Sequence, residues 1–253
     1  MTRVVKSAIE WRELKKKEVE GKSVGFVPTM GALHEGHLSL MKKSLEDNKI
    51  TVVSSFVNPT QFNDKNDFEK YPESFDEDLG KLNTLNVDYL FYPDYEEIYH
   101  DKYRYSIVEK ELSRILCGAF RAGHFEGVLT VVMKLLNIIK PKRAYFGEKD
   151  YQQYLLIKGM ADAFFMDVEI IPCPIVREDD GLAMSSRNLR LKEDERIKAA
   201  LFPELLKNSP TPEAAAAKLT EKGFKVDYIE EYMGRRFGAV HLGNVRLIDN
   251  VRK

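Results

Sequence analysis

The sequence passes from a strand through a loop into a helix at Phe26-Val27-Pro28-Thr29-Met30-Gly31-Ala32-Leu33-His34-Glu35-Gly36-His37-Leu38. The apolar run at 24–27 predicts a buried strand, which we expect to stop at Pro28 because proline cannot donate to a sheet ladder. Apolar residues then recur at helical spacing from Leu38 to Leu45, so the loop opens a helix. Such a loop aims free backbone N–H groups and the positive end of a helix dipole at an anion. The stretch therefore predicts a phosphate site.

His34 and His37 stand three residues apart in this loop. At that spacing, side chains share one face of a helical turn, so both imidazoles could contact one phosphate. Imidazole donates a hydrogen bond whether it is neutral or charged. Two other interpretations stay open: histidines with a structural or solvent-exposed role, and a zinc site, although metalloprotease helices space their histidines four apart.

Strand-like and helix-like segments alternate through the first 174 residues. The expected strands cover 24–27, 50–56, 87–92, 143–146 and 168–171, and the expected helices 72–85, 127–139 and 151–164, with a polar loop at 63–71. This alternation predicts an α/β fold, a Rossmann-like doubly wound parallel sheet with helices on both faces. Ligands of such sheets lie beyond the carboxyl ends of the strands, which here means the loops at 28–37, 58–62 and 147–150.

The pattern changes near residue 174. A helix is expected at about 192–206, more helix in the Pro/Ala stretch 210–217, and short strands at 225–232 and 245–248. We expect two domains: a Rossmann-like nucleotide-binding catalytic domain at 1–174 and a small C-terminal α+β domain at 175–253.

Composition narrows the class of protein. Of 253 residues, 43% are hydrophobic and 31% charged, which describes a globular chain. Lys plus Arg number 39 against 40 acidic residues, so no overall field favours nucleic acid or a membrane, and an anion must be bound by a local site. Cys117 and Cys173 form no disulfide or metal framework, which suits a reducing cytoplasm. No apolar run reaches membrane-spanning length, and the first residues lack a secretory signal, so we expect neither insertion nor export.

Two further loops carry groups suited to phosphates. In Gly147-Glu148-Lys149-Asp150, the lysine would stand beside phosphates and the aspartate near a metal or a ribose. An ordinary strand-to-helix turn with exposed charges is the alternative. Ser185-Ser186-Arg187 combines two hydroxyls with a guanidinium, a cradle for a triphosphate, although the same tripeptide is common in surface loops. The usual Gly-x-Gly-x-x-Gly and P-loop fingerprints are missing, so ATP would bind by another scheme.

Amides and one further cation could contact a small polar substrate. Asn58 and Gln61 offer neutral amides to hydroxyl and carboxylate groups, or else cap a turn at the strand end. Arg121 and His124 place a cation and an imidazole ahead of a buried helix, or else simply form a helix entry with a solvent-facing arginine.

Five motifs in this order resemble the pantothenate synthetase (pantoate-beta-alanine ligase) family of the nucleotidylyltransferase superfamily. They are Pro-Thr-Met-Gly-Ala-Leu-His-x-Gly-His, Asn-Pro-x-Gln-Phe, Gly-His-Phe, Phe-Gly-Glu-Lys-Asp-x-Gln-Gln and Met-Ser-Ser-Arg-Asn. The resemblance implies a Rossmann-like domain, a C-terminal lid domain, a homodimer and a two-step reaction. Pantoate's carboxylate would attack the α-phosphate of Mg-ATP to give pantoyl adenylate and pyrophosphate, and the amine of beta-alanine would then displace AMP.

The resemblance also implies residue roles. His37 would be the proton donor or charge stabiliser, and Gln61 and Gln153 would hold pantoate, with Gln61 also facing beta-alanine. His34, Lys149, Arg187 and Mg²⁺ suit the neutralisation of charge that attack on a polyanion requires. The ATP contacts would come from Met30, Gly31, Ala32, Leu33, His34, Glu35, Gly36, His37, Gly147, Glu148, Lys149, Asp150, Val176, Met184, Ser185, Ser186 and Arg187.

Asp78 is the candidate Mg²⁺ ligand, in an acidic segment that would equally suit the first turn of a helix. Two residues depart from the family pattern, Ala122 in place of a usual proline and Glu126 in place of a frequent basic residue. The region 202–243 is also expected to be shorter than in the family. The rivals are an adenylyltransferase for a nucleotide or phosphopantetheine, an RNA-binding relative of a tRNA synthetase, and an inactive binding module. The neutral amides argue against the first, and near-zero net charge against the second.

Overall fold

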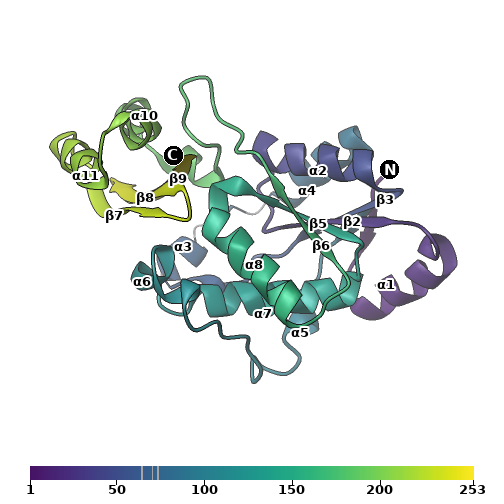
Figure 1. Cartoon of the computed structure of the whole chain (residues 1–253). Helices are drawn as coiled ribbons and strands as arrows, with labels where there is room; N and C mark the ends of the chain where they lie inside the picture. The colour runs from purple at the N-terminus through teal and green to yellow at the C-terminus, as the bar shows by residue number, and fades with distance from the viewer. Residues whose placement is uncertain (64, 70, 73) are drawn as a thin grey trace.

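The computed structural model describes residues 1–63, 65–69, 71–72 and 74–253, which form two sheets with their helices (Figure 1). The larger sheet has six strands, all parallel, in the order β1-β4-β3-β2-β5-β6. Its strands are β1 (Arg3–Val5), β2 (Val24–Thr29), β3 (Ile50–Ser55), β4 (Tyr89–Phe91), β5 (Arg143–Gly147) and β6 (Glu169–Cys173). The predicted doubly wound parallel sheet is confirmed, and the edge strand β1 was missed.

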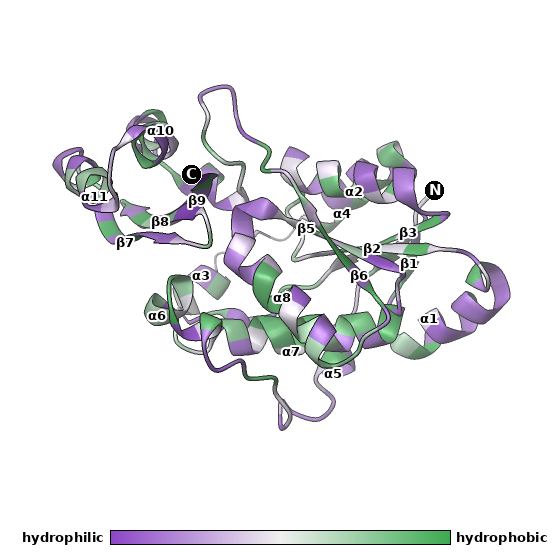
Figure 2. Cartoon of the chain, in the orientation of Figure 1, coloured by the Kyte–Doolittle hydropathy of each residue, from purple (hydrophilic) through white to green (hydrophobic). Residues whose placement is uncertain are grey.

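The pleat of the sheet sends alternate residues into two cores. Phe26 and Val52 pack in the core under the helices α1 (Ala8–Leu14), α7 (His124–Ile139) and α8 (Tyr151–Ala163). Their neighbours Val27 and Val53 pack in the core under α2 (Glu35–Asp47) and α4 (Phe75–Leu85). These apolar layers run along the strands and inner helix faces in Figure 2. The other α-helices described in this part are α3 (Lys65–Glu69), α5 (Tyr95–Ile98) and α6 (Cys117–Phe120).

β2 continues through Pro28 to Thr29, so the expected stop at Pro28 is wrong. The Thr29 carbonyl accepts from Phe56 N–H on the β3 side, 3.1 Å away. Backbone N–H and C=O groups of successive strand residues point to opposite neighbouring strands, so those of Pro28 point toward β5. Pairing with β5 extends only through Phe26, so the missing N–H of Pro28 removes no ladder bond.

Two other local predictions need correction. The loop expected at 63–71 contains the short helix α3, and α4 begins at Phe75 rather than at residue 72. The expected start of that helix includes Glu73, which lies outside the described residues.

The C-terminal part forms an antiparallel sheet, β7 (Lys225–Tyr232), β8 (Arg235–Leu242) and β9 (Val245–Arg252), covered by helices. The helix expected at 192–206 is two helices, α9 (Glu193–Ala199) and α10 (Leu201–Asn208), followed by α11 (Pro212–Glu221). This part has its own apolar cluster around Phe202 and Val240. Tyr228 and Phe237 instead join the main core, so the smaller sheet packs on the larger unit.

The strand order reverses between β2 and β5, because β2 leads to β3 on one side and β5 to β6 on the other. In open parallel sheets, the crevice at the carboxyl ends of two such strands is where ligands bind. The loops that follow β2 and β5 are therefore placed side by side at this point.

No helix in the described part of the chain combines the length and apolarity needed to cross a membrane.

Candidate active site

The loop after β2 is held in an unusual conformation by Asp78 of α4. Gly31 and Ala32 both have left-handed backbones, with φ of 81° and 51°. One carboxylate oxygen of Asp78 accepts from Ala32 N–H and the other from Leu33 N–H, each at 2.8 Å. Lys81 donates to the Leu33 carbonyl at 2.6 Å. The loop is thus preformed by an anion from α4.

This geometry changes the interpretation of Asp78. Its carboxylate is buried, accepts a third hydrogen bond from the Ser74 hydroxyl at 3.0 Å, and does not line the main cavity. Within the described residues, no group of three His, Cys, Asp or Glu side chains could hold a metal ion. In this structure Asp78 positions the loop, which differs from the direct Mg²⁺ ligation expected from the sequence.

His34 and His37 stack at the start of α2, with ring centroids 4.0 Å apart. Gly36 N–H donates to Nδ1 of His34 at 3.1 Å, and His34 N–H donates to Nδ1 of His37 at 3.4 Å. A neutral ring that accepts at Nδ1 carries its proton on Nε2. Each histidine can therefore offer an Nε2–H group to an anion.

Burial keeps both rings neutral. It lowers the pKa of His34 to about 4, with a further contribution from the Lys149 charge. Burial, reinforced by the neighbouring His34, lowers the pKa of His37 to about 3. Both residues are hydrogen-bond donors without charge at neutral pH in the ligand-free protein.

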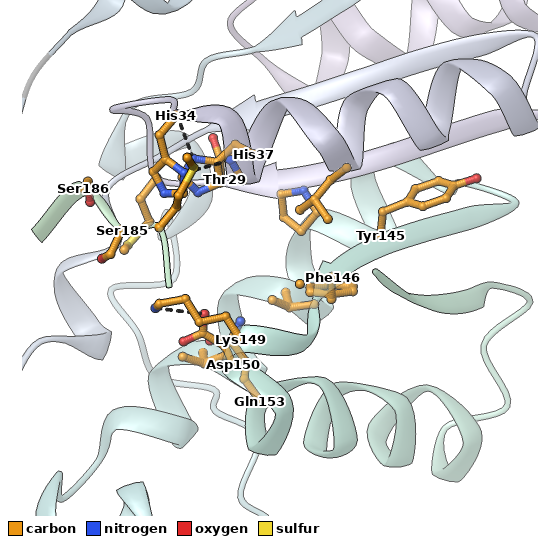
Figure 3. A pocket seen from close by; sticks show the side chains of 18 of the residues that line it. Thr29, His34, His37, Tyr145, Phe146, Lys149, Asp150, Gln153, Ser185 and Ser186 are labelled. Carbon is orange, nitrogen blue, oxygen red and sulfur yellow. Dashed lines mark hydrogen bonds and ion pairs between the residues drawn. The ribbon is translucent and has the colours of Figure 1, made fainter. Parts of the chain in front are cut away.

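One cavity joins the three predicted segments. It is lined by His34 and His37 after β2, by Lys149 and Asp150 after β5, and by the 184–187 segment before α9. Figure 3 shows Ser185 and Ser186 beside the two histidines, with Lys149 and Asp150 across the gap. The predicted lining residues found there are Met30, His34, Gly36, His37, Asn58, Gln61, Gly147, Lys149, Asp150, Gln153, Val176, Met184, Ser185, Ser186 and Arg187.

Five residues expected at the ATP site lie off this cavity. The N–H groups of Ala32 and Leu33 are taken by Asp78. Glu35 is exposed, 3.6 Å from Lys42, and Glu148 pairs with Arg235 of the C-terminal sheet at 2.9 Å. Gly31 lines a neighbouring cavity instead. These residues shape the loops and do not face the gap.

Asn58 serves mainly as a turn cap. It is buried, its carbonyl accepts from the Tyr99 hydroxyl at 2.9 Å, and its amide donates to the Gly127 carbonyl at 3.2 Å. The same amide contacts Gln61 Oε1 at 3.2 Å and so orients Gln61 at the cavity wall. Of the two interpretations of Asn58, the structure favours the capped turn.

Arg121 and His124 lie behind the cavity wall. His124 is buried, and its Nε2 lies 2.9 Å from the Arg121 guanidinium, which can only donate, so Nδ1 donates to the Gln61 carbonyl at 2.8 Å. Burial lowers the pKa of His124 to about 3, with the Arg121 charge contributing. His124 therefore supports Gln61 from behind and is not among the residues lining the cavity.

Several lining residues had no sequence signal. Tyr71 enters from the segment after α3, with its hydroxyl hydrogen-bonded to Ser186. An apolar wall is built by Val128, Val131, Val132 and Leu135 of α7, which the sequence presented only as core. The cavity thus combines a cationic, hydroxyl-rich end with an apolar wall.

Comparison with known proteins identifies the family. The sequence model described as Pantoate-beta-alanine ligase matches residues 3–252. The chain belongs to this family. A pantothenate synthetase of Bdellovibrio bacteriovorus is 54% identical over 252 residues, covering 100% of both chains, and one of Coxiella burnetii is 50% identical over 99% of this chain and 97% of that protein.

Solved structures of the family superpose closely. The pantoate-beta-alanine ligase of Francisella tularensis, described as complexed with beta-gamma ATP and beta-alanine, has a TM-score of 0.95 at 42% identity and covers 100% of this chain and 98% of that chain. The Thermus thermophilus pantothenate synthetase has a TM-score of 0.92 at 36% identity, with 99% of each chain covered. The C-terminal region is therefore not shorter than in these ligases, and the expectation that it would be shorter is wrong.

Proposed function

We propose that this ligase joins pantoate to beta-alanine in an ATP-dependent reaction that passes through pantoyl adenylate and releases AMP and pyrophosphate. The observation that carries the proposal is the single cavity onto which the His34/His37 loop, the Lys149 loop and the Ser185–Arg187 segment converge.

The cationic end of the cavity suits the first step. A carboxylate oxygen of pantoate bonds to the α-phosphorus while the bond to the β-phosphate oxygen breaks. This attack needs charge to be neutralised more than it needs a base. In our proposal His37 and His34 donate Nε2–H bonds to phosphate oxygens, and Lys149 and Arg187 supply positive charge. The serine hydroxyls of Ser185 and Ser186 orient the β- and γ-phosphates.

The other end of the cavity suits pantoate, which carries two methyl groups, hydroxyls and a carboxylate. Gln61 and Gln153 offer amides to its polar groups. The valines of α7 and Leu135 form an apolar surface for its methyl groups. Arg121 and His124 act on the substrate through Gln61 in this arrangement.

Magnesium fits the donor set as a companion of the nucleotide. Mg²⁺ usually keeps several waters and takes one or two carboxylates together with substrate phosphates. Asp150 supplies a carboxylate to the cavity, and opposing charges, Lys149 first among them, hold its pKa below the usual value despite burial. When bound there, Mg²⁺ would neutralise charge on the phosphate oxygens.

The second step needs protection from water, because the acyl adenylate is a hydrolysable anhydride. We propose that residues 1–174 form the catalytic domain and that residues 175–253 form a lid that closes over it when ligands bind. The separate apolar cluster around Phe202 supports this division. Tyr228 packs on the main core, so this contact would hold one end of the lid against the catalytic domain.

We further propose a homodimer located in the cytoplasm. Tyr105 and Val108, 72% and 56% exposed, place apolar groups on the segment between α5 and α6, where a second copy could cover them. Both cysteines are buried free thiols, as a reducing compartment allows. Light scattering at several concentrations would give the dimer mass if this is correct, and a monomer mass throughout would contradict it.

Exchange of labelled pyrophosphate into ATP tests the adenylation step. We expect exchange that requires pantoate and does not require beta-alanine. Exchange seen only with a nucleotide or with phosphopantetheine would favour another adenylyltransferase and would overturn the proposed substrate.

A further inference from the structure

A second cationic pocket opens beside the ATP cavity, between the loop after β5 and the C-terminal sheet. The two cavities share Lys149, Asp150, Ser185 and Arg187, so they adjoin at the end where the β- and γ-phosphates would lie. The charged residues that line it are Asp67, Arg121, Lys149, Asp150, Arg187, Arg190, Asp227 and Arg246. We refer to this space as the second pocket.

The second pocket carries excess positive charge. Among its described lining residues, five arginine or lysine side chains face three carboxylates. Arg246 is matched by Asp227 at 2.8 Å. Arg121 instead contacts neutral acceptors, Asn63 Oδ1 at 3.4 Å and His124 Nε2 at 2.9 Å. Burial, reinforced by the nearby Arg187, lowers the pKa of Arg121 to about 10. A partly buried cation with neutral partners favours an anion in the space before it.

Asp67 of α3 occupies part of this space as an internal anion. One of its carboxylate oxygens accepts from Arg187 at 2.8 Å and the other from Arg190 at 2.5 Å. Two guanidinium groups that converge on two oxygens of one carboxylate are also arranged to bind two oxygens of a phosphate group. The carboxylate and a phosphate cannot occupy the same donors at once.

We propose that the second pocket binds the pyrophosphate that adenylate formation releases, and that Asp67 occupies Arg187 and Arg190 when pyrophosphate is absent. This inference rests on the proposed function, since only adenylation produces this leaving group. Pyrophosphate carries more charge than a single carboxylate, so it displaces Asp67 from the guanidinium pair. Movement of pyrophosphate into the second pocket separates it from the adenylate and leaves the acyl carbon open to beta-alanine.

Two substitutions are expected to change pyrophosphate binding in opposite directions. Calorimetric titration of magnesium pyrophosphate into the full-length, ATP-free protein would measure the Kd. Arg190→Gln removes a donor and should weaken binding about tenfold. Asp67→Asn removes the competing charge and should tighten binding several-fold. Arg196→Gln is the matched control, because Arg196 pairs with Asp180 and does not line the second pocket.

Unchanged or weaker pyrophosphate binding in Asp67→Asn would overturn the inference, as would unchanged binding in Arg190→Gln. The KM for ATP separates the second pocket from the ATP site: the Arg190→Gln effect on the pyrophosphate Kd should exceed its effect on this KM at least fivefold, and equal effects would place Arg190 in the ATP site instead. The proposed function fails separately, through an absence of pantoate-dependent exchange in the unsubstituted protein.

Discussion

At the scale of single residues, the hydrogen bonds of His37 fix which ring nitrogen faces the cavity. Its Nδ1 is occupied by a backbone N–H group, so the neutral ring offers Nε2–H to the cavity. We predict that His37→Ala keeps the fold and lowers kcat about a hundredfold or more, as expected for a donor aimed at transition-state charge. Steady-state kinetics and circular dichroism would measure both effects. His100→Ala, at an exposed position, is the control, and unaltered turnover in His37→Ala would remove His37 from the mechanism.

Three histidines with lowered pKa values predict how stability depends on pH. Burial lowers the pKa of His34 to about 4 and the pKa of His37 and His124 to about 3, from an ordinary 6.5. The unfolded chain therefore takes up protons at a pH where the folded chain does not. The stabilising contribution is fully present above pH 6.5 and is lost as the pH falls toward 4 and 3.

Urea unfolding between pH 6.5 and 5 would measure this loss, because most carboxylates stay ionised in that window. Each such histidine contributes a slope of up to about 1.4 kcal/mol per pH unit. His37→Gln removes one titrating group and should reduce the slope by roughly one third. A slope that is unchanged in this variant would contradict the neutral state of His37.

Asp78 allows a direct choice between positioning and metal ligation. The two oxygens of Asp78 each accept from one backbone N–H group. Asn at this position has a single carbonyl oxygen, so one N–H group keeps its acceptor and the other faces the amide hydrogens of the asparagine. We predict that Asp78→Asn lowers kcat/KM for ATP about tenfold because the His34/His37 loop loosens. Added Mg²⁺ should not restore activity. Recovery at high Mg²⁺ would return Asp78 to the role of metal ligand, and Asp76→Asn, exposed in the same turn, is the control.

At the scale of elements, a close approach between α7 and the turn at 59–61 sets the position of Gln61. A Cβ on Gly127 would lie 2.4 Å from the Thr60 carbonyl oxygen and 2.7 Å from Gln61 N, so the turn must shift. We predict that Gly127→Ala raises the KM for pantoate about tenfold, because about 1 Å of misplacement is enough for such a loss. Gly159→Ala in α8 meets nothing within 4 Å and should leave this KM unchanged while stabilising the helix. Equal values for both variants would contradict the role assigned to the turn.

The elements that the sequence predicted well were those with a single strong signal. The long apolar strand β3 and the helix α8, which follows directly after the strand and loop at 143–150, were placed within a residue or two. β1 was missed because three residues are too few for a pattern. β8 was missed because it begins with Arg235 and Arg236, whose charges suggest a surface. In the fold both arginines are buried, Arg236 donating to the carbonyl groups of Leu206 and Ser209.

At the scale of the whole molecule, the convergence of three distant segments was predictable, and the walls between them were not. The motif around His37 and that around Lys149 follow strands that flank the point where the strand order reverses, so topology alone brings them together. Tyr71 and Val128 reach the cavity through packing of α3 and α7, which no local pattern reveals. A role for Arg190 likewise follows only from its contact with Asp67, which lies more than one hundred positions away in the chain.

The whole-molecule claim is that one cavity carries out both halves of a ligation. AMP release in a coupled assay, with ATP, Mg²⁺, pantoate and beta-alanine present and each omitted in turn, tests it most directly. We predict sustained AMP release only when all four are present. Sustained release without pantoate, or no release in the complete mixture, would contradict the account.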